Sequence, residues 1–227
     1  MINILMSRSD LIHPMIKPSL ESYIKPGMKV TVICFSFFDQ QYPTAKNYRI
    51  DYAPEGQYYV KVLEQLTPFG ILEKDVSWVS YFDDRKAEAI QKIQSADILF
   101  FPGGAPDRFM ARIHEKKLFE AINHHQKTYI GVSAGTMIQL ADYHISPDTD
   151  YQSFSYQKGL KLLSGFFIEV HYRRRRKQKS GMRKVFRAYK QPIYVIPDDG
   201  CIIVTNHEIK TIHTAKKYYD QQGVCRY

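Results

Sequence analysis

Residues 129–136 read YIGVSAGT, and this stretch predicts the fold more clearly than any other part of the chain. Its first four residues, YIGV, are typical of a buried strand, and a helix is predicted over 136–143. Between the two lies the pattern G-x-S-x-G, in which a sharp strand-to-helix turn exposes a serine hydroxyl. The same pattern also occurs in turns that only begin a helix, but the strand and helix around it favour Ser133 as a nucleophile.

Further short apolar runs, rich in β-branched and aromatic residues, are predicted to be buried strands. They cover residues 30–35, 76–82, 97–101, 166–170, 193–196 and 201–205. Apolar residues at helical spacing lie between several of these runs, over 55–67, 85–94 and 106–122. Strands that alternate with helices predict an α/β fold, here a three-layer sandwich with a mostly parallel central sheet. No repeat or Pro/Gly/Ser-rich linker divides the chain, so residues 1–227 are predicted to form a single domain.

A second unusual loop, Pro102-Gly103-Gly104, follows the predicted strand 97–101. In mostly parallel sheets, binding sites form at the carboxyl ends of the strands, where this loop and the serine turn both lie. On its own such a loop is more often one that simply requires positive φ, but adjacent glycines also let the backbone approach a ligand closely. Beside a nucleophilic serine, the N–H groups of Gly104 and Ala134 are the candidate oxyanion donors.

A serine nucleophile needs a general base, and His171 is the candidate among the eight histidines. It ends the apolar run 166–170, where a strand is expected to meet the rim of the site. A histidine at a strand end is more often structural, but its position at the same sheet edge as Ser133 favours a catalytic role.

The group that should orient this histidine is left open by the residues alone. Asp198 and Asp199 follow the predicted strand 193–196, although acidic pairs in turns are often only turn formers. Glu169 lies two residues before His171, and side chains two apart on a strand share a face. All three carboxylates are therefore candidates.

The net charge of +9 comes from one local feature. Ten Lys and Arg residues and no acidic residue lie in 173–190, whereas the other 22 basic residues are balanced by 23 acidic ones. The stretch has three interpretations: a solvated basic loop, a surface for nucleic acid or another polyanion, or arginine forks that bind a substrate carboxylate. Its position directly after His171 favours the last over a polyanion surface.

The remaining composition predicts an ordinary cytoplasmic protein. Three cysteines without a CxxC spacing argue against a disulfide framework and against a structural zinc site. The N-terminal residues have no signal-peptide pattern, and no apolar run is long enough to cross a membrane. Neither a metal nor a cofactor is expected.

Four motifs occur in an order that resembles the peptidase E and cyanophycinase family of serine peptidases. They are FFPGG at 100–104, GVSAGT at 131–136, LLSGFFIEVHYRRRR at 162–176 and IPDDG at 196–200. The resemblance covers roughly residues 75–205. It implies a fold similar to class I glutamine amidotransferase domains, with serine in place of cysteine at the turn.

The family pattern also implies a role for individual residues. Ser133 matches the nucleophile, and His171, which follows the segment GLKLL at 159–163, matches the histidine. Asp198 matches the family's acid, which is usually Glu, so its side chain is shorter by one methylene. The resemblance therefore implies a Ser133–His171–Asp198 triad in a dipeptidase E-like enzyme that cuts peptide bonds next to aspartyl or other acidic residues.

The same resemblance implies that Arg173 and Arg175 bind the substrate, a small acidic peptide. Neither a membrane nor nucleic acid is expected as a partner, and a homodimer is left open. Two other functions also remain open. An α/β-hydrolase-type esterase would require the order Ser, acid, His, with His207 or His213 as the base, and an inactive relative would use its basic stretch to bind a polyanion.

Overall fold

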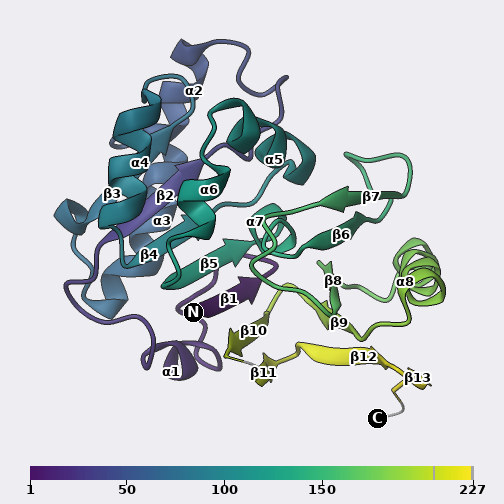
Figure 1. Ribbon diagram of the computed structural model, residues 1–227. Helices are drawn as coiled ribbons and strands as arrows, with labels where there is room; N and C mark the ends of the chain where they lie inside the picture. The colour runs from purple at the N-terminus through teal and green to yellow at the C-terminus, as the bar shows by residue number, and fades with distance from the viewer. Residues whose placement is uncertain (207, 226–227) are drawn as a thin grey trace.

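The computed structural model describes residues 1–206 and 208–225, and its largest sheet is built on parallel strands (Figure 1). Among these residues, seven strands form this sheet in the order β11-β10-β1-β5-β4-β2-β3. The five from β1 to β3 in that order are parallel, whereas β10 runs antiparallel to β1, and β11 runs antiparallel to β10. The bounds are β1 Ile2–Met6, β2 Val30–Cys34, β3 Val76–Ser80, β4 Ile98–Phe101, β5 Thr128–Val132, β10 Gly200–Thr205 and β11 Glu208–His213.

Helices cover both faces of this sheet because successive side chains of each strand point to opposite faces. In β4, for example, Phe100 packs into the core on one face and Phe101 into the core on the other. The helices on the first face are α1 Lys17–Leu20, α2 Ala45–Tyr52 and α3 Gln57–Leu66. Those on the second are α4 Lys86–Ser95, α5 Pro106–Glu115 and α6 Phe119–Asn123. Two 3-10 turns, η1 Thr67–Phe69 and η2 Glu73–Asp75, follow α3. This arrangement confirms the predicted α/β fold with a mostly parallel central sheet.

A second, smaller sheet carries the strands that precede His171 and Asp198. In the described residues its order is β13-β12-β9-β8, and β8 and β9 are parallel neighbours. The bounds are β8 Phe167–Val170, β9 Ile193–Ile196, β12 Lys216–Asp220 and β13 Gly223–Val224. The expectation that one parallel sheet brings all three triad residues to its edge is therefore wrong, because two of them come from this second sheet.

Two predicted helices differ in the structure. The helix expected over 136–143 is only α7, Ala134–Met137, and the chain then enters the hairpin of β6 Asp142–Ile145 and β7 Ser155–Lys158. The helix expected over 106–122 is divided into α5 and α6, with Lys117 between them at a φ of 56°. Apolar spacing alone does not detect such breaks, since buried residues continue through both elements.

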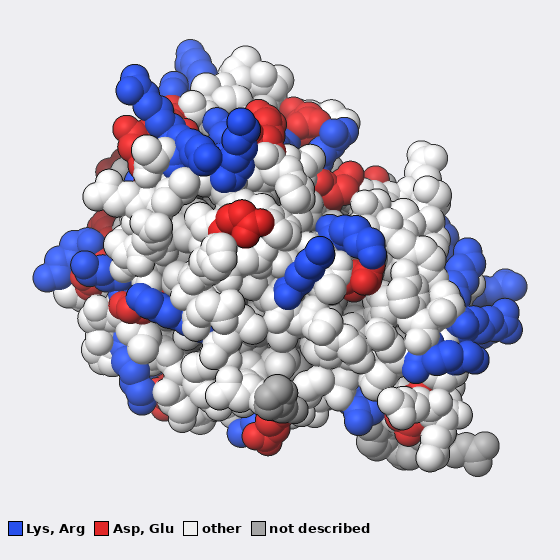
Figure 2. All heavy atoms as spheres, in the orientation of Figure 1, with Lys and Arg blue, Asp and Glu red and all other residues white. Residues whose placement is uncertain are grey.

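The basic stretch is a helix rather than a loop: α8 spans Arg176–Tyr189. Its buried side recurs at helical spacing and packs on the smaller sheet through Met182 and Val185. The lysines and arginines occupy its exposed side and form the blue group at the right-hand edge of Figure 2, where α8 lies in Figure 1. In the part of the chain that the structure describes, no helix is both long and apolar enough to cross a membrane.

Candidate active site

Ser133 lies at the sharp turn between β5 and α7. Its φ of 49° and ψ of −108° are far from those of any regular element, and such strain in a non-glycine residue is often stored at functional sites. Its N–H donates to the Met6 carbonyl at 2.8 Å. The buried Thr136 hydroxyl accepts the Met6 N–H at 2.9 Å and lies 2.7 Å from the Gly131 carbonyl oxygen. Bonds to β1 and within the turn thus hold the strained geometry.

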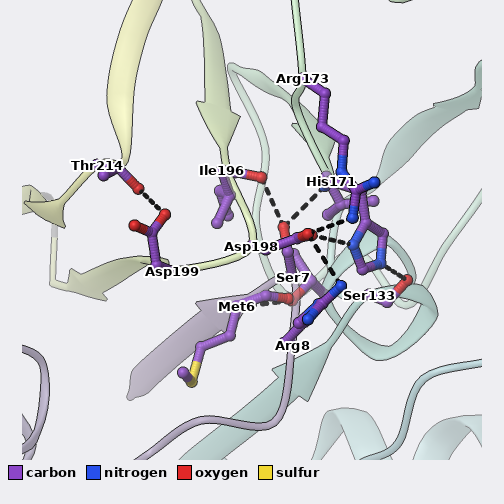
Figure 3. A network of polar contacts seen from close by, with 12 residues as sticks. Met6, Ser7, Arg8, Ser133, His171, Arg173, Ile196, Asp198, Asp199 and Thr214 are labelled. Carbon is purple, nitrogen blue, oxygen red and sulfur yellow. Dashed lines mark hydrogen bonds and ion pairs between the residues drawn. The ribbon is translucent and has the colours of Figure 1, made fainter. Parts of the chain in front are cut away.

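His171 follows β8 and connects Ser133 to Asp198 (Figure 3). His171 Nδ1 lies 2.7 Å from Asp198 Oδ1, and Nε2 lies 2.9 Å from Ser133 Oγ. A carboxylate only accepts hydrogen bonds, so Nδ1 carries the proton, and in the neutral ring Nε2 accepts from the serine hydroxyl. His171 itself has a φ of 50°, so the chain turns sharply there as well.

Two arginines face the other oxygen of the Asp198 carboxylate. Arg173 donates to Oδ2 at 2.5 Å, and the Arg8 guanidinium lies 3.1 Å from the same atom (Figure 3). Partial burial would raise the pKa of Asp198, but the hydrogen bonds from His171 and Arg173 and the charge of Arg8 outweigh it and hold that pKa below its ordinary value. The lowered pKa favours the ionised form of Asp198, which accepts the hydrogen bond from His171 Nδ1.

The other two candidate acids contact different histidines. Asp199 points away from His171 in Figure 3, accepts a hydrogen bond from the Thr214 hydroxyl at 2.5 Å and lies 3.2 Å from His213. Glu169 is buried and lies 2.7 Å from His144 Nε2. Of the three carboxylates, the structure brings only Asp198 to His171.

Ser7 connects the large sheet to the small sheet at the site, and the sequence did not predict this role. Its buried hydroxyl accepts the N–H of His171 at 2.9 Å and donates to the carbonyl of Ile196 at 2.6 Å. Ser7 directly follows β1 of the large sheet, whereas the other two residues belong to the smaller sheet. No motif marks a serine at this position, so only the fold reveals the link.

The glycine loop after β4 lies against the serine turn. A Cβ at Gly103 would be 3.4 Å from the Cβ of Ser133, and Gly104 has a φ of 143°. Within the described residues, neither the Gly104 N–H nor the Ala134 N–H has a hydrogen-bond partner in the protein. Both N–H groups are thus available to a ligand beside Ser133, as oxyanion donors must be.

A cavity of about 480 Å³ opens beside Ser133 and His171. Arg173 and Arg175, the predicted substrate-binding residues, both line it, together with Lys177. Arg173 already binds Asp198, whereas Arg175 has no acidic partner among the described residues. The cavity also includes the side chain of Gln178, which accepts the Arg173 N–H at 2.9 Å and donates to the His171 carbonyl at 2.9 Å. Gln178 thus fixes the loop that carries the arginines.

No set of three or more His, Cys, Asp or Glu side chains that could hold a metal ion occurs in the described residues. The α/β-hydrolase alternative would use His207 or His213 as the base. His207 lies outside the described residues, and His213 lies beside Asp199, while the serine hydroxyl is bonded to His171. The order along the chain is therefore Ser, His, acid.

A serine on a strained turn, bonded through a histidine to a carboxylate, is the arrangement of a serine hydrolase. Comparison with known families agrees, since the family model described as Peptidase family S51 matches residues 42–212. The chain belongs to peptidase family S51, so it is a serine peptidase, and the predicted resemblance to peptidase E is confirmed.

Solved structures with this fold have low sequence identity to the chain. One is a Listeria monocytogenes EGD-e protein with a provisional assignment as peptidase E. It has a TM-score of 0.66 and 20% identity, over 92% of this chain and 96% of that one. Another is a peptidase from an acI-B1 Actinobacterium, with a TM-score of 0.62 and 13% identity over 95% and 93% of the two chains. No curated protein sequence matches the chain.

Proposed function

We propose that this serine peptidase uses a Ser133–His171–Asp198 triad to cut peptide bonds next to aspartyl or other acidic residues, as a dipeptidase. The observation that carries the proposal is the continuous series of contacts, 2.7 Å from Asp198 to His171 and 2.9 Å from His171 to Ser133. The order of the three residues along the chain agrees with the family pattern.

In the proposed mechanism, Ser133 Oγ attacks the carbonyl carbon of the scissile bond while His171 Nε2 takes its proton. The N–H groups of Gly104 and Ala134 stabilise the negative charge that develops on the carbonyl oxygen. His171 then gives the proton to the leaving amine, and the acyl group stays on Ser133 until water, activated by the same histidine, releases it. Asp198 keeps the proton on Nδ1 and stabilises the imidazolium.

The proposed preference for acidic substrates rests on one arginine, Arg175, and not on the summed charge of the cavity beside Ser133, because Asp148, Asp150 and Glu169 line that cavity too. Arg175 is exposed, lines this cavity and has no acidic partner among the described residues, so its guanidinium is free to bind a carboxylate by two hydrogen bonds. Arg173 contributes positive charge while it holds Asp198. Arg175 is therefore the residue proposed to recognise the acidic side chain of the substrate.

A panel of dipeptides tests this proposal. The wild-type protein should hydrolyse aspartyl-alanine with a kcat/KM at least about tenfold higher than asparaginyl-alanine, since a charged hydrogen bond is worth about 1.5–3 kcal/mol. Arg175→Ala should remove most of that ratio. Arg176→Ala is the matched control, because Arg176 is the next residue and does not line the cavity. Equal loss on both substrates in Arg175→Ala would reject the recognition role.

The exposed basic side of α8 supports a second candidate, in which this face binds a polyanion. Nine Lys and Arg residues between 174 and 190 have no acidic partner among the described residues, and no acid interrupts them. The two candidates differ in how binding depends on length: a small acidic peptide saturates a cavity, whereas affinity for a polyanion rises with polymer length and falls steeply with salt. Competition between a dipeptide and oligoaspartates of increasing length separates them.

A further inference from the structure

Ser133 and His171 line two cavities, not one. Beside the larger cavity lies a second of about 340 Å³, and Phe38, Gly104, Ser133 and His171 belong to both linings. A peptide bond whose carbonyl carbon is at Ser133 therefore has a cavity available on each side of it. If the arginine-lined cavity takes the acidic residue, the second cavity is available to the residue on the other side of the bond.

Several aromatic rings form part of the wall of the second cavity. Phe37, Tyr52, Tyr58 and Phe100 all contribute to its wall. The rings of Tyr52 and Tyr58 are stacked with their centroids 5.0 Å apart and an angle of 9° between their planes. Tyr48 stacks on the far side of Tyr52, at 4.4 Å, so this wall is backed by a buried ring. Such a surface suits an apolar or aromatic side chain.

The charged residues of this second cavity are all basic, unlike those of the first. No acidic residue is among those that line it, whereas Arg8 and Lys61 are. Arg8 contacts Asp198, but Lys61 has no ion-pair partner within the described residues, and its Nζ lies 5.8 Å from the centroid of the Tyr58 ring. An unpaired cation beside an apolar wall is suited to an amino acid whose side chain packs on the wall and whose carboxylate meets the cation.

We propose that the second cavity binds the leaving residue of the substrate, as an apolar or aromatic amino acid whose free α-carboxylate pairs with Lys61. The proposal rests on the proposed function, because that function assigns the acidic residue to the other cavity. It names the substrate class more narrowly: a dipeptide with an acidic residue first and a large apolar residue second. It also gives a physical reason for cutting dipeptides, since the carboxylate that Lys61 binds exists only where the chain ends.

Binding to the full-length Ser133→Ala protein tests the inference without turnover. By titration calorimetry, aspartyl-phenylalanine should bind about tenfold more tightly than aspartyl-alanine, the order expected for an apolar pocket. Aspartyl-phenylalanine amide should bind about tenfold more weakly than aspartyl-phenylalanine with a free carboxylate. Adding Tyr58→Ala should make aspartyl-phenylalanine and aspartyl-alanine bind with nearly equal affinity. Adding Lys61→Ala should make the free acid and the amide bind with nearly equal affinity. Tyr156→Ala is the control, because this exposed tyrosine of β7 lines neither cavity.

The inference would be overturned by equal affinity for the two dipeptides or by no measurable binding of aspartyl-phenylalanine. It would also be overturned if Tyr58→Ala kept the full difference in affinity between the two dipeptides. Circular dichroism checks each variant, and Tyr58→Leu replaces Tyr58→Ala if the latter does not fold. Lys61 is exposed, so its substitution gives a result in either case. A different result would refute the proposed function alone. In that case the wild-type enzyme would hydrolyse aspartyl-alanine and asparaginyl-alanine equally well but would still favour phenylalanine over alanine as the second residue.

Discussion

The Ser7 hydroxyl accepts the backbone N–H of His171 at 2.9 Å, and this bond joins the end of β1 to the end of β8. The serine side of the site belongs to the large sheet, and the histidine and aspartate belong to the small one. Because the same hydroxyl also donates to the Ile196 carbonyl, one buried side chain links both strand ends of the small sheet to β1, the neighbour of the strand that leads to Ser133. Ser7 is therefore a positioning residue.

Ser7→Ala should lower kcat by about 10- to 100-fold with a smaller change in KM. A small displacement of His171 lowers the fraction of molecules in which its Nε2 is placed to take the Ser133 proton. The free energy of unfolding should fall by about 1–3 kcal/mol, since the His171 N–H loses its partner and the Ile196 carbonyl keeps only the Tyr172 N–H. Kinetics and urea unfolding measure the two effects. Ser180→Ala, at an exposed serine of α8, is the control. An unchanged kcat in a destabilised Ser7→Ala would contradict the positioning role.

Asp198→Asn should lower kcat by about 10³- to 10⁴-fold, in line with other serine triads, because an amide does not hold the Nδ1 proton of His171 as a carboxylate does. Asp199→Asn should leave kcat nearly unchanged, since Asp199 contacts Thr214 and His213 instead. Steady-state kinetics on an acidic dipeptide compares the two. The assignment is wrong if the Asp199 variant loses more activity while both proteins stay folded.

Ser133→Ala and His171→Ala should each remove nearly all turnover, and the double variant should be hardly worse than either. Triad residues act as a unit, so the losses do not add. A single-turnover assay with high enzyme concentration gives the sensitivity that is needed. Full activity in Ser133→Ala would remove the basis of the proposed mechanism.

Gly104→Ala should destabilise the fold and abolish activity. A Cβ there would lie 2.0 Å from the Ser36 carbonyl oxygen, and the φ of 143° alone costs a non-glycine residue about 1–3 kcal/mol. Gly103→Ala is the matched comparison, because its Cβ would meet no atom closer than 3.4 Å and its φ is not positive. Thermal unfolding should separate the two variants clearly. Equal melting temperatures would mean that the loop adopts another conformation.

Asp198 should also contribute to the pH dependence of stability. Its pKa in the folded protein is lowered below the ordinary value by the hydrogen bonds from His171 and Arg173, so the folded state binds that proton more weakly than the unfolded state does. The contribution is therefore complete above the ordinary pKa of an aspartate, about 3.9, and is lost as the pH falls through the lower folded value. Urea unfolding between pH 6 and 3 should show wild type and Asp198→Asn becoming more alike toward acid pH. A difference that grows toward pH 3 would contradict the lowered pKa.

The sequence by itself determined the elements that local chemistry specifies. The apolar run before Ser133 and the small residues after it predict a strand and a sharp turn, and both occur at β5 and α7. The motif order and its resemblance to a known family led to Ser133, His171 and Asp198, which the structure brings into contact. These signals are local, since backbone sterics and hydrophobic periodicity act over a few residues.

Only the tertiary structure decided which strands share a sheet, and with that the choice among the carboxylates. Asp198 and Asp199 are adjacent and chemically identical, yet the alternation of side chains beyond β9 sends one toward His171 and the other toward Thr214. Ser7 likewise lies 164 positions from His171, and no short-range pattern carries that contact. Contacts of this kind depend on how two sheets pack against each other, which is a property of the whole core.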